Sequence, residues 1–199
     1  MKLSFNAEIA GKTTEYDIMF KTGDDVRQDQ LVLQMIVLLD TLLRQVNVKF
    51  PFTVYKCLAA SKDDGMIEFV KNSLTIQEIQ FKYESDLMKF LEARSKSEFE
   101  LKQITETYLL SSAGYAAVTY LLAIGDRHLE NLMVQDSGHL FHIDFGYILG
   151  KNPPNKDRWV PPIRINEPMV KGMGGIDSKG YAEFKQKTID AIIHLRNYR

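Results

Sequence analysis

The decisive stretch of this sequence reads Gly125-Asp-Arg-His-Leu-Glu-Asn131 and, after two short apolar runs, His142-Ile-Asp-Phe-Gly146. The runs at 132–134 and 140–143 flank a turn at 136–138, a pattern that predicts a β-hairpin. The hairpin places Asn131 and Asp144 at the ends of adjacent strands. An amide oxygen and a carboxylate suit Mg²⁺, which keeps several waters and takes further ligands from substrate phosphates. The pattern therefore predicts a site for a metal ion and a phosphate group.

The spacing within the first stretch indicates phosphoryl transfer. Asp126 precedes Asn131 by the interval found in the protein-kinase loop His-Arg-Asp-x-x-x-x-Asn, although the order of the triplet is inverted here. Kinases also need a lysine on an N-terminal strand and a helix carboxylate to orient it. Lys21 ends a predicted strand, and Asp29 lies in the first turn of the next predicted helix. The four elements occur in the order that a kinase requires, with Lys21 predicted to contact nucleotide phosphates.

A metal-dependent hydrolase is the alternative from a different class. His128, His139, His142 and Asp144 are side chains that bind transition metals, and the last two share one face of a strand. This interpretation gives the lysine, the helix carboxylate and the asparagine no role, so phosphoryl transfer is favoured. A non-catalytic module that binds a nucleotide or a partner is a further alternative.

The residues leave the general base open. Its spacing to Asn131 favours Asp126, whereas a neutral imidazole near pH 7 is the better-matched proton acceptor and favours His128. We favour His128, oriented by Asp126.

Composition sets limits around this site. The chain has 199 residues, 45% apolar and 26% charged, which suits one large globular domain or two small lobes. Its 25 basic and 26 acidic residues argue against a protein that coats nucleic acid. Cys57 is the single cysteine, which favours a reducing compartment. No apolar run reaches the ~18 residues of a membrane span, and no signal-peptide pattern begins the chain, so we expect any membrane contact to be peripheral.

Periodicity predicts an α+β fold, β-rich in its N-terminal part and mainly helical in its C-terminal part, with a cleft between them. The charged segment 81–106 is loosely helical and is not assigned. The predicted elements are antiparallel strands at 3–7 and 16–20, a helix at 27–46, strands at 51–60 and 66–70 around a turn at 63–65, a helix at 104–123, the hairpin, a loop at 150–175 and a helix at 181–198.

Several motifs resemble the catalytic domain of the phosphatidylinositol 3-kinases, and the similarity extends over nearly the whole chain. They are Phe20-Lys-Thr-Gly-Asp-Asp-Val-Arg-Gln-Asp-Gln30, Ser112-Ala-Gly-Tyr115, Gly125-Asp-Arg-His128 and Phe141-His-Ile-Asp-Phe-Gly146. The resemblance implies a two-lobed, protein-kinase-like fold, with an N-lobe and hinge at about 1–72 and a C-lobe at 73–199. It also implies truncation at both ends, because the family's phosphate-gripping loop and last helices are missing, and inactivity of residues 1–199 alone.

The subclass is less clear than the family. Gly146-Tyr-Ile-Leu-Gly150 and Met169-Val-Lys-Gly-Met-Gly-Gly175 are most similar to the class III, vacuolar-sorting type. The hinge-like Ile67-Glu-Phe-Val-Lys-Asn-Ser73 is closer to class I. A phosphatidylinositol 4-kinase, a class I-like enzyme and a protein kinase of the same superfamily therefore stay as alternatives.

The resemblance assigns roles to individual positions. Lys21 would contact phosphates, Asn131 and Asp144 would bind Mg²⁺ or Mn²⁺, and 147–175 would be the activation loop. The catalytic triplet would be Asp126, Arg127 and His128, with the first and last flanking the attacking inositol hydroxyl. The adenine pocket would be made by Asp29 and Tyr55 at its back, Ile143 beneath the ring, and the hinge residues Glu68, Phe69 and Val70.

The implied reaction transfers the γ-phosphate of ATP to the 3-hydroxyl of phosphatidylinositol. The segment 151–162 has only three scattered cations and an opposing Asp157, so we expect an unphosphorylated headgroup to be preferred. The resemblance further implies a regulatory kinase-like subunit, a beclin-type subunit and no nucleic-acid partner. The expected location is cytoplasmic, peripheral on endosomal or autophagic membranes.

Overall fold

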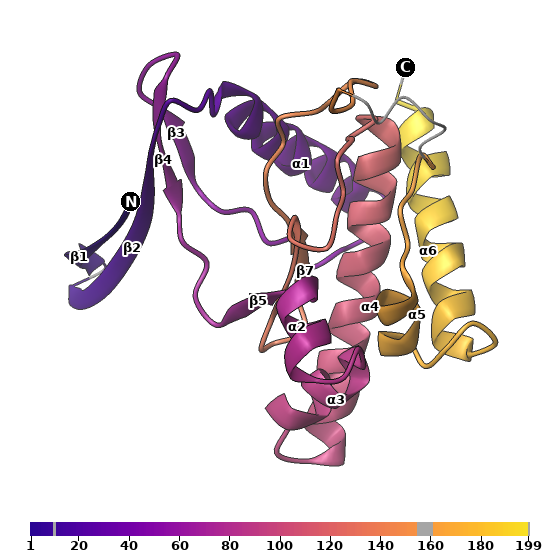
Figure 1. Ribbon diagram of the computed structural model, residues 1–199. Helices are drawn as coiled ribbons and strands as arrows, with labels where there is room; N and C mark the ends of the chain where they lie inside the picture. The colour runs from indigo at the N-terminus through magenta and orange to yellow at the C-terminus, as the bar shows by residue number, and fades with distance from the viewer. Residues whose placement is uncertain (10, 155–160, 199) are drawn as a thin grey trace.

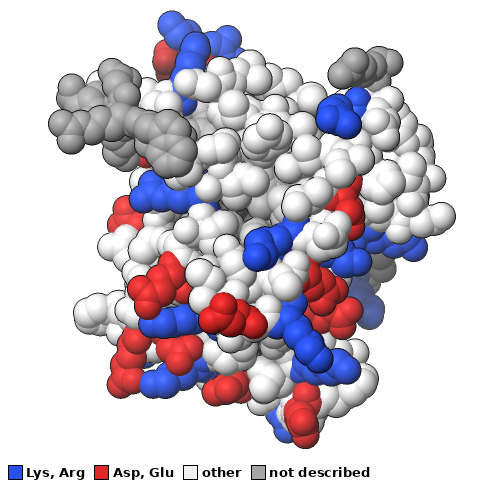
Figure 2. Space-filling view, turned by 90° about the vertical axis from the view of Figure 1, so that its right-hand side faces the viewer, with Lys and Arg blue, Asp and Glu red and all other residues white. Residues whose placement is uncertain are grey.

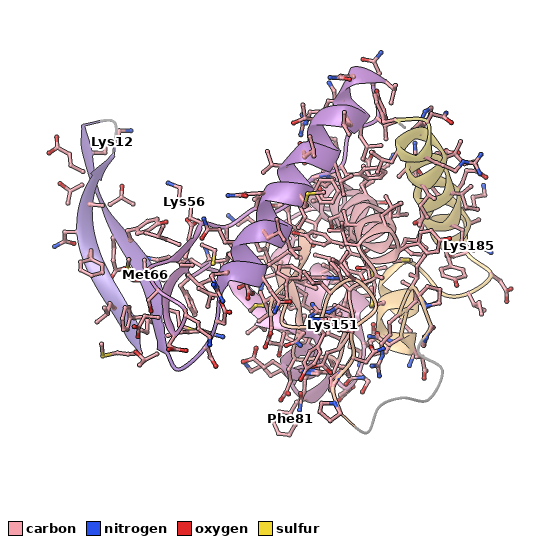
Figure 3. All side chains as sticks on the ribbon, turned by 90° about the horizontal axis from the view of Figure 1, so that it is seen from above. Lys12, Lys56, Met66, Phe81, Lys151 and Lys185 are labelled. Carbon is pink, nitrogen blue, oxygen red and sulfur yellow. The ribbon has the colours of Figure 1, made fainter. Side chains whose placement is uncertain are left out.

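The computed structural model describes residues 1–9, 11–154 and 161–198. The alternating N-terminal residues form the predicted antiparallel pair, β1 (Lys2–Ile9) and β2 (Lys12–Thr22). β4 (Asp64–Glu68) pairs with β2, and β3 (Cys57–Ala59) pairs with β4, which gives the strand order β1-β2-β4-β3. The β1–β2 hairpin extends away from the helices, with Lys12 at its tip (Figure 3).

The first helix, α1 (Arg27–Gln45), confirms the helix predicted at 27–46. Val32, Leu33, Ile36, Leu39 and Leu43 recur at helical spacing and are all buried. α1 packs against β3, an edge strand of this sheet. The first turn carries Asp29, as predicted, where a carboxylate is favoured by the partial positive charge of the helix N-terminus.

The strand predicted at 51–60 is wrong except for Cys57–Ala59. Pro51 has no N–H for a ladder, and the aromatic side chains around it turn inward. The Phe52 ring meets the Tyr115 ring edge-on, with centroids 5.3 Å apart. Packing against the core therefore sets the path of this segment.

The turn predicted at 63–65 is also misplaced, because Asp64 and Gly65 begin β4. Gly65 lies opposite Lys21 on one side and Ala59 on the other. A Cβ at this position would lie 2.1 Å from Cγ2 of Val26, the residue before α1. Val26 can therefore pack this closely against β4 only because residue 65 is a glycine.

The C-terminal part has a second antiparallel sheet and several helices (Figure 1). The strands are β5 (Ser73–Thr75), β6 (Leu132–Gln135) and β7 (Leu140–His142); the helices are α2 (Ile76–Lys82), α3 (Leu87–Arg94), α4 (Glu98–Leu121), α5 (Glu167–Gly172) and α6 (Lys179–Arg196). The sheet has the order β5-β6-β7, and the pairing of β6 with β7 confirms the predicted hairpin. α4 and α6 lie side by side, and α4 also packs against β7.

Side-chain caps explain where the sequence predictions differ from these helices. Thr75 and Glu78 form a capping box at α2, and Asp86 caps α3 within the unassigned segment. Ser97 caps α4, so that helix begins before residue 104. Asn166 caps α5, which interrupts the loop predicted at 150–175. Capping satisfies the free N–H groups of helices that are short or weakly periodic.

The second sheet begins at Ser73, while the division of the chain into lobes at residue 72 stays a prediction. Over the described residues, no helix has the length and apolar character needed to cross a membrane. On the face shown in Figure 2, Lys and Arg side chains are interspersed with Asp and Glu over its lower half.

α4 is joined to the second sheet by a buried aromatic contact. The Tyr115 ring stacks on the His142 ring at 4.8 Å between centroids, and Thr119 Oγ1 lies 3.4 Å from His142 Nδ1. Burial, together with the nearby Arg127 charge, lowers the pKa of His142 well below its ordinary 6.5. The imidazole is therefore neutral in the folded protein at pH 7.

We predict that His142 makes the protein sensitive to acid. Below pH 6.5 the unfolded chain takes up a proton at this side chain and the folded chain does not, so stability present above pH 6.5 is lost as the pH falls. The loss should approach about 1.4 kcal/mol per pH unit. His142→Phe keeps the ring contact and should flatten this dependence in urea unfolding between pH 7.5 and 5.5. An equally steep loss in the variant would contradict the assignment.

Candidate active site

A cavity of about 330 Å³ lies between the two sheets. Its walls come from β2 and β4, the segment after β4, and the strands β6 and β7. The predicted metal ligands Asn131 and Asp144 line it. So does every residue predicted to bind the nucleotide: Lys21, Asp29, Tyr55, Glu68, Phe69, Val70 and Ile143. The structure thus brings all of these side chains together around one cavity.

The cavity also has an apolar lining that the sequence analysis did not assign to it. Met19 precedes Lys21 by two residues on β2, so the two side chains share a face of the strand. Ile67 lies directly opposite Met19 on β4. The alternation along β2 was the signal for Met19, whereas the pairing with β4 is not visible in the sequence. The remaining unassigned lining residues are Thr75, Met133 and Phe141.

Lys21 and Asp29, the predicted lysine and helix carboxylate, make further contacts that the sequence did not predict. Lys21 Nζ lies 3.5 Å from Asp24 Oδ2. Asp29 is buried, and its Oδ1 accepts a hydrogen bond of 3.1 Å from the Phe145 N–H. Burial raises the pKa of Asp29, and the charge of Asp144 adds to the effect. Asp29 therefore ties α1 to the Asp-Phe-Gly segment as well as facing the cavity.

The two predicted metal ligands are brought together by the hairpin. Leu132 lies opposite His142 in the register, and Ile143 N–H donates to the Asn131 carbonyl at 3.1 Å. The Asn131 amide nitrogen donates to the Asp126 carbonyl at 3.0 Å, which leaves the amide oxygen as the atom that a cation could bind. The donor set of one amide oxygen and one carboxylate fits Mg²⁺.

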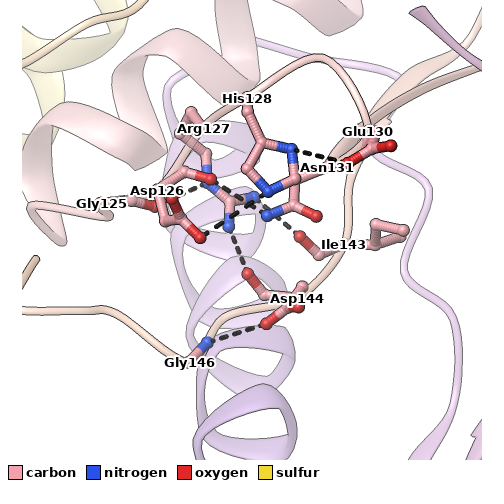
Figure 4. A network of polar contacts seen from close by, with 9 residues as sticks. All are labelled: Gly125, Asp126, Arg127, His128, Glu130, Asn131, Ile143, Asp144 and Gly146. Atoms are coloured by element: carbon pink, nitrogen blue, oxygen red, sulfur yellow. Dashed lines mark hydrogen bonds and ion pairs between the residues drawn. The ribbon is translucent and has the colours of Figure 1, made fainter. Parts of the chain in front are cut away.

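Two aspartates of the site have left-handed backbone. The φ angle is 53° at Asp126 and 60° at Asp144, values that are uncommon outside glycine. Gly146 N–H donates to Asp144 Oδ1 at 3.4 Å (Figure 4). Such conformations persist where the surrounding contacts hold them, and they cluster at functional sites.

Arg127 connects the two decisive stretches. The residue is 3% exposed, and its guanidinium donates to the carbonyls of Gly125 and Ile143, each at 2.8 Å, and to that of Asp144 (Figure 4). It also lies over the Phe145 ring. Burial lowers the pKa of Arg127 to about 10, so the group is still charged at pH 7. These contacts support a positioning role for a residue predicted to be catalytic.

His128 lies between two carboxylates. Its Nε2 is 3.7 Å from Asp126 Oδ2, and its Nδ1 is 3.8 Å from Glu130 Oε2 (Figure 4). Glu130 was not predicted, although it lies in the same stretch two residues after the histidine. The arrangement offers an imidazole that can accept a proton next to a carboxylate that can orient it. The choice between Asp126 and His128 as base stays a prediction.

The structure does not bring together the histidines that the metal-dependent hydrolase would need as ligands. The His142 ring is buried against Tyr115, and His139 Nδ1 lies 2.9 Å from the Ser137 hydroxyl. Within residues 1–9, 11–154 and 161–198, no three His, Cys, Asp or Glu side chains gather in a way that could hold a metal ion.

The predicted activation loop is only partly described. Of the three cations noted in 151–162, Lys156 and Arg158 lie outside the described residues, together with the opposing Asp157. The expectation about the headgroup that rests on them therefore stays a prediction.

A β-rich N-terminal part and a mainly helical C-terminal part, with this cavity between their sheets, make up the two-lobed, protein-kinase-like fold. The family model for phosphatidylinositol 3- and 4-kinase matches residues 15–199. The chain belongs to this family, and the resemblance seen in the sequence is confirmed.

Curated relatives include the phosphatidylinositol 3-kinase, nodule isoform, of Glycine max and the phosphatidylinositol 3-kinase VPS34 of Arabidopsis thaliana. Each is 40% identical over 98% of this chain and 24% of the relative. The phosphatidylinositol 3-kinase VPS34 of Saccharomyces cerevisiae is 39% identical over 95% of this chain and 22% of the relative. The chain thus spans about a quarter of the length of these curated relatives.

We predict that Arg127→Lys lowers the free energy of unfolding by about 2–4 kcal/mol. The three donors of an ammonium lie on one atom and cannot span the three carbonyls that separate guanidinium nitrogens reach, so buried acceptors are left unpaired. Urea unfolding measures the effect. Arg44→Lys is the control, because Arg44 makes an exposed ion pair with Asp40 on α1 and should change stability by less than about 0.5 kcal/mol. Equal stabilities of the two variants would show that Arg127 does not hold the two stretches together.

Proposed function

We propose that this chain is the catalytic part of a phosphatidylinositol 3-kinase, which transfers the γ-phosphoryl group of ATP to the 3-hydroxyl of phosphatidylinositol. The observation that carries the proposal is the single cavity, which gathers the predicted nucleotide and metal residues in a chain of this family. The curated relatives named above are phosphatidylinositol 3-kinases by name.

The nucleotide would bind along the length of the cavity. Adenine fits between the apolar side chains of β2, β4, β6 and β7, against the backbone of Glu68 and Val70. Asp29 and Tyr55 close the back, and Ile143 lies beneath the ring. Lys21 would contact the phosphates at the polar end. The ion pair of Lys21 with the exposed Asp24 is weak enough to be exchanged for a phosphate.

Asn131 and Asp144 would hold Mg²⁺, or Mn²⁺, at the same end of the cavity, since their oxygen atoms fit such a cation. When bound, the ion neutralises charge on the transferred phosphoryl group. His128 would accept the proton of the inositol 3-hydroxyl, and Asp126 would orient the imidazole. Arg127 would hold the loop that carries both residues against the Asp-Phe-Gly segment.

The lipid substrate would be unphosphorylated phosphatidylinositol at a membrane surface. The sparse cations of the activation loop support this choice, because added headgroup phosphates need Arg or Lys partners. A cytoplasmic, peripheral location on endosomal or autophagic membranes is part of the proposal. So are the regulatory kinase-like and beclin-type subunits.

A phosphatidylinositol 4-kinase is the second candidate, because the matching family model covers both enzymes. The hinge-like segment 67–73 keeps a class I-like enzyme as a third. The position of the new phosphate distinguishes the 4-kinase from the main proposal, and the preferred lipid distinguishes the class I-like enzyme from it.

We predict that the full-length protein converts phosphatidylinositol to phosphatidylinositol 3-phosphate and that Asp144→Ala abolishes this turnover, since the metal ion loses a ligand. Lys21→Met should remove most of the activity in a folded protein. The measurement is a lipid kinase assay on matched vesicles with product regiochemistry. A 4-phosphate product would favour the 4-kinase, and a clear preference for the 4,5-bisphosphate lipid would favour a class I-like enzyme. Near-normal turnover of a folded Asp144→Ala or Lys21→Met variant would overturn the site.

We predict that His128→Ala lowers turnover by about 10²–10⁴-fold, the usual contribution of a general base. Affinity for ATP should stay nearly unchanged, because the imidazole lies outside the nucleotide cavity. Kinetic constants and nucleotide titration on the same preparation give both quantities. A collapse of ATP affinity would assign His128 a structural role and make Asp126 the preferred base.

A further inference from the structure

Residues 68–72, from the last residue of β4 to the residue before β5, form the hinge, and they bond to the β1–β2 hairpin. Ile18 lies opposite Glu68 at the end of the β2–β4 ladder. One residue beyond, the Phe69 N–H donates to the Asp17 carbonyl at 2.9 Å, which continues the pairing into the hinge. Alternation along β2 puts Asp17 on the same face as Met19 and Lys21, the two residues of this strand that line the nucleotide cavity.

The Asp17 carboxylate is a buried charge with two cationic partners. The side chain is 5% exposed, and Oδ2 lies 3.0 Å from Lys2 Nζ and 3.4 Å from Lys71 Nζ. Hydrogen bonds from the Ser4 hydroxyl and the Lys2 ammonium lower the pKa of Asp17 to about 2. The carboxylate is therefore ionised at neutral pH and holds one lysine from β1 and one from the hinge.

Both lysines make a second contact that fixes the hinge. Lys71 Nζ donates to the Glu15 carbonyl and to Glu15 Oε2, each at 3.0 Å. Lys2 Nζ lies 4.4 Å from the centroid of the Phe69 ring, within the range of a cation–π contact. Residues of the hairpin thus hold the hinge near its start, at Phe69, and near its far end, at Lys71.

The hinge also forms part of the wall of the nucleotide cavity, through Glu68, Phe69 and Val70. Asp17, Lys2 and Lys71 are not among the residues that line that cavity. They fix the position of the backbone groups to which adenine would bond without contacting the nucleotide. Rigid placement of such groups before binding raises affinity, because less ordering is left to occur on binding.

We propose that Asp17 is a positioning residue that sets the affinity of the site for the adenine end of the nucleotide, acting on the hinge through Lys2 and Lys71. The inference rests on the proposed function of the cavity as an ATP site. Asp17→Asn leaves two ammonium groups facing a neutral amide, so their mutual repulsion weakens the attachment of the hinge at Lys71, where only the contacts with Glu15 are left.

The test compares two ligands in the full-length protein. The dissociation constant of ATP with Mg²⁺ is measured by calorimetry, and tripolyphosphate, which has no base, is measured as a competitive inhibitor. Asp17→Asn should raise the dissociation constant and KM for ATP about tenfold, which corresponds to about 1.4 kcal/mol, with kcat within about twofold. The inhibition constant of tripolyphosphate should not change, because it would bind at Lys21 and the metal ligands.

Lys71→Met keeps the test valid if Asp17→Asn does not fold, and it should weaken ATP binding in the same direction. Lys89→Met is the matched control, since Lys89 pairs with Glu84 at the surface of α3 and should leave both constants unchanged. ATP affinity like that of the wild type in both Asp17→Asn and Lys71→Met would overturn the inference alone. So would an equal loss of ATP and tripolyphosphate binding. A wild-type protein that binds neither ligand would overturn the proposed function and this inference with it.

Discussion

The site depends on one buried cation. Arg127 reaches from the stretch that carries Asp126 and His128 to the carbonyls of Ile143 and Asp144, and its burial makes each of these bonds costly to lose. Asn131 and the hairpin complete the same connection from the other side, since Ile143 bonds back to the Asn131 carbonyl. The backbone segments that carry the proposed base and the proposed metal ligand are therefore held together by bonds to buried carbonyls.

The nucleotide end of the site is built by a different principle. The sheet of β1, β2, β4 and β3 supplies it through strand register, because Lys21 and Met19 share a face of β2 and Ile67 lies opposite Met19. Asp29 joins this sheet region to the catalytic loops by its bond to Phe145. Strand pairing thus places the residues predicted to bind the nucleotide, and the buried Arg127 places those predicted to be catalytic. Asp29 connects the two groups of residues.

Much of this arrangement could be predicted from the sequence, for reasons that differ between elements. β1, β2, α1 and α6 have clear periodicity, and the catalytic stretch has a fixed spacing of polar residues. β5, α2 and α5 are too short to show a periodic pattern. The two helices depend on their N-terminal caps, Thr75 and Asn166. The path of residues 51–56 depends on aromatic packing against α4. The local sequence of the segment does not show this contact, because Phe52 and Tyr115 are distant in the chain. The contacts of Arg127 and Asp17 could not be predicted, since their partners are backbone carbonyls or lysines distant in sequence.

The left-handed backbone at Asp126 and Asp144 limits how this chain can change during evolution. Asparagine and glycine tolerate such a conformation, whereas β-branched residues are strongly disfavoured in it. A descendant that lost the two carboxylates but kept this fold would therefore be expected to acquire Asn or Gly at these positions, and Val, Ile or Thr only with a rebuilt loop. The residue that replaces each aspartate would thus distinguish a paralogue that has kept the fold from one that is losing it.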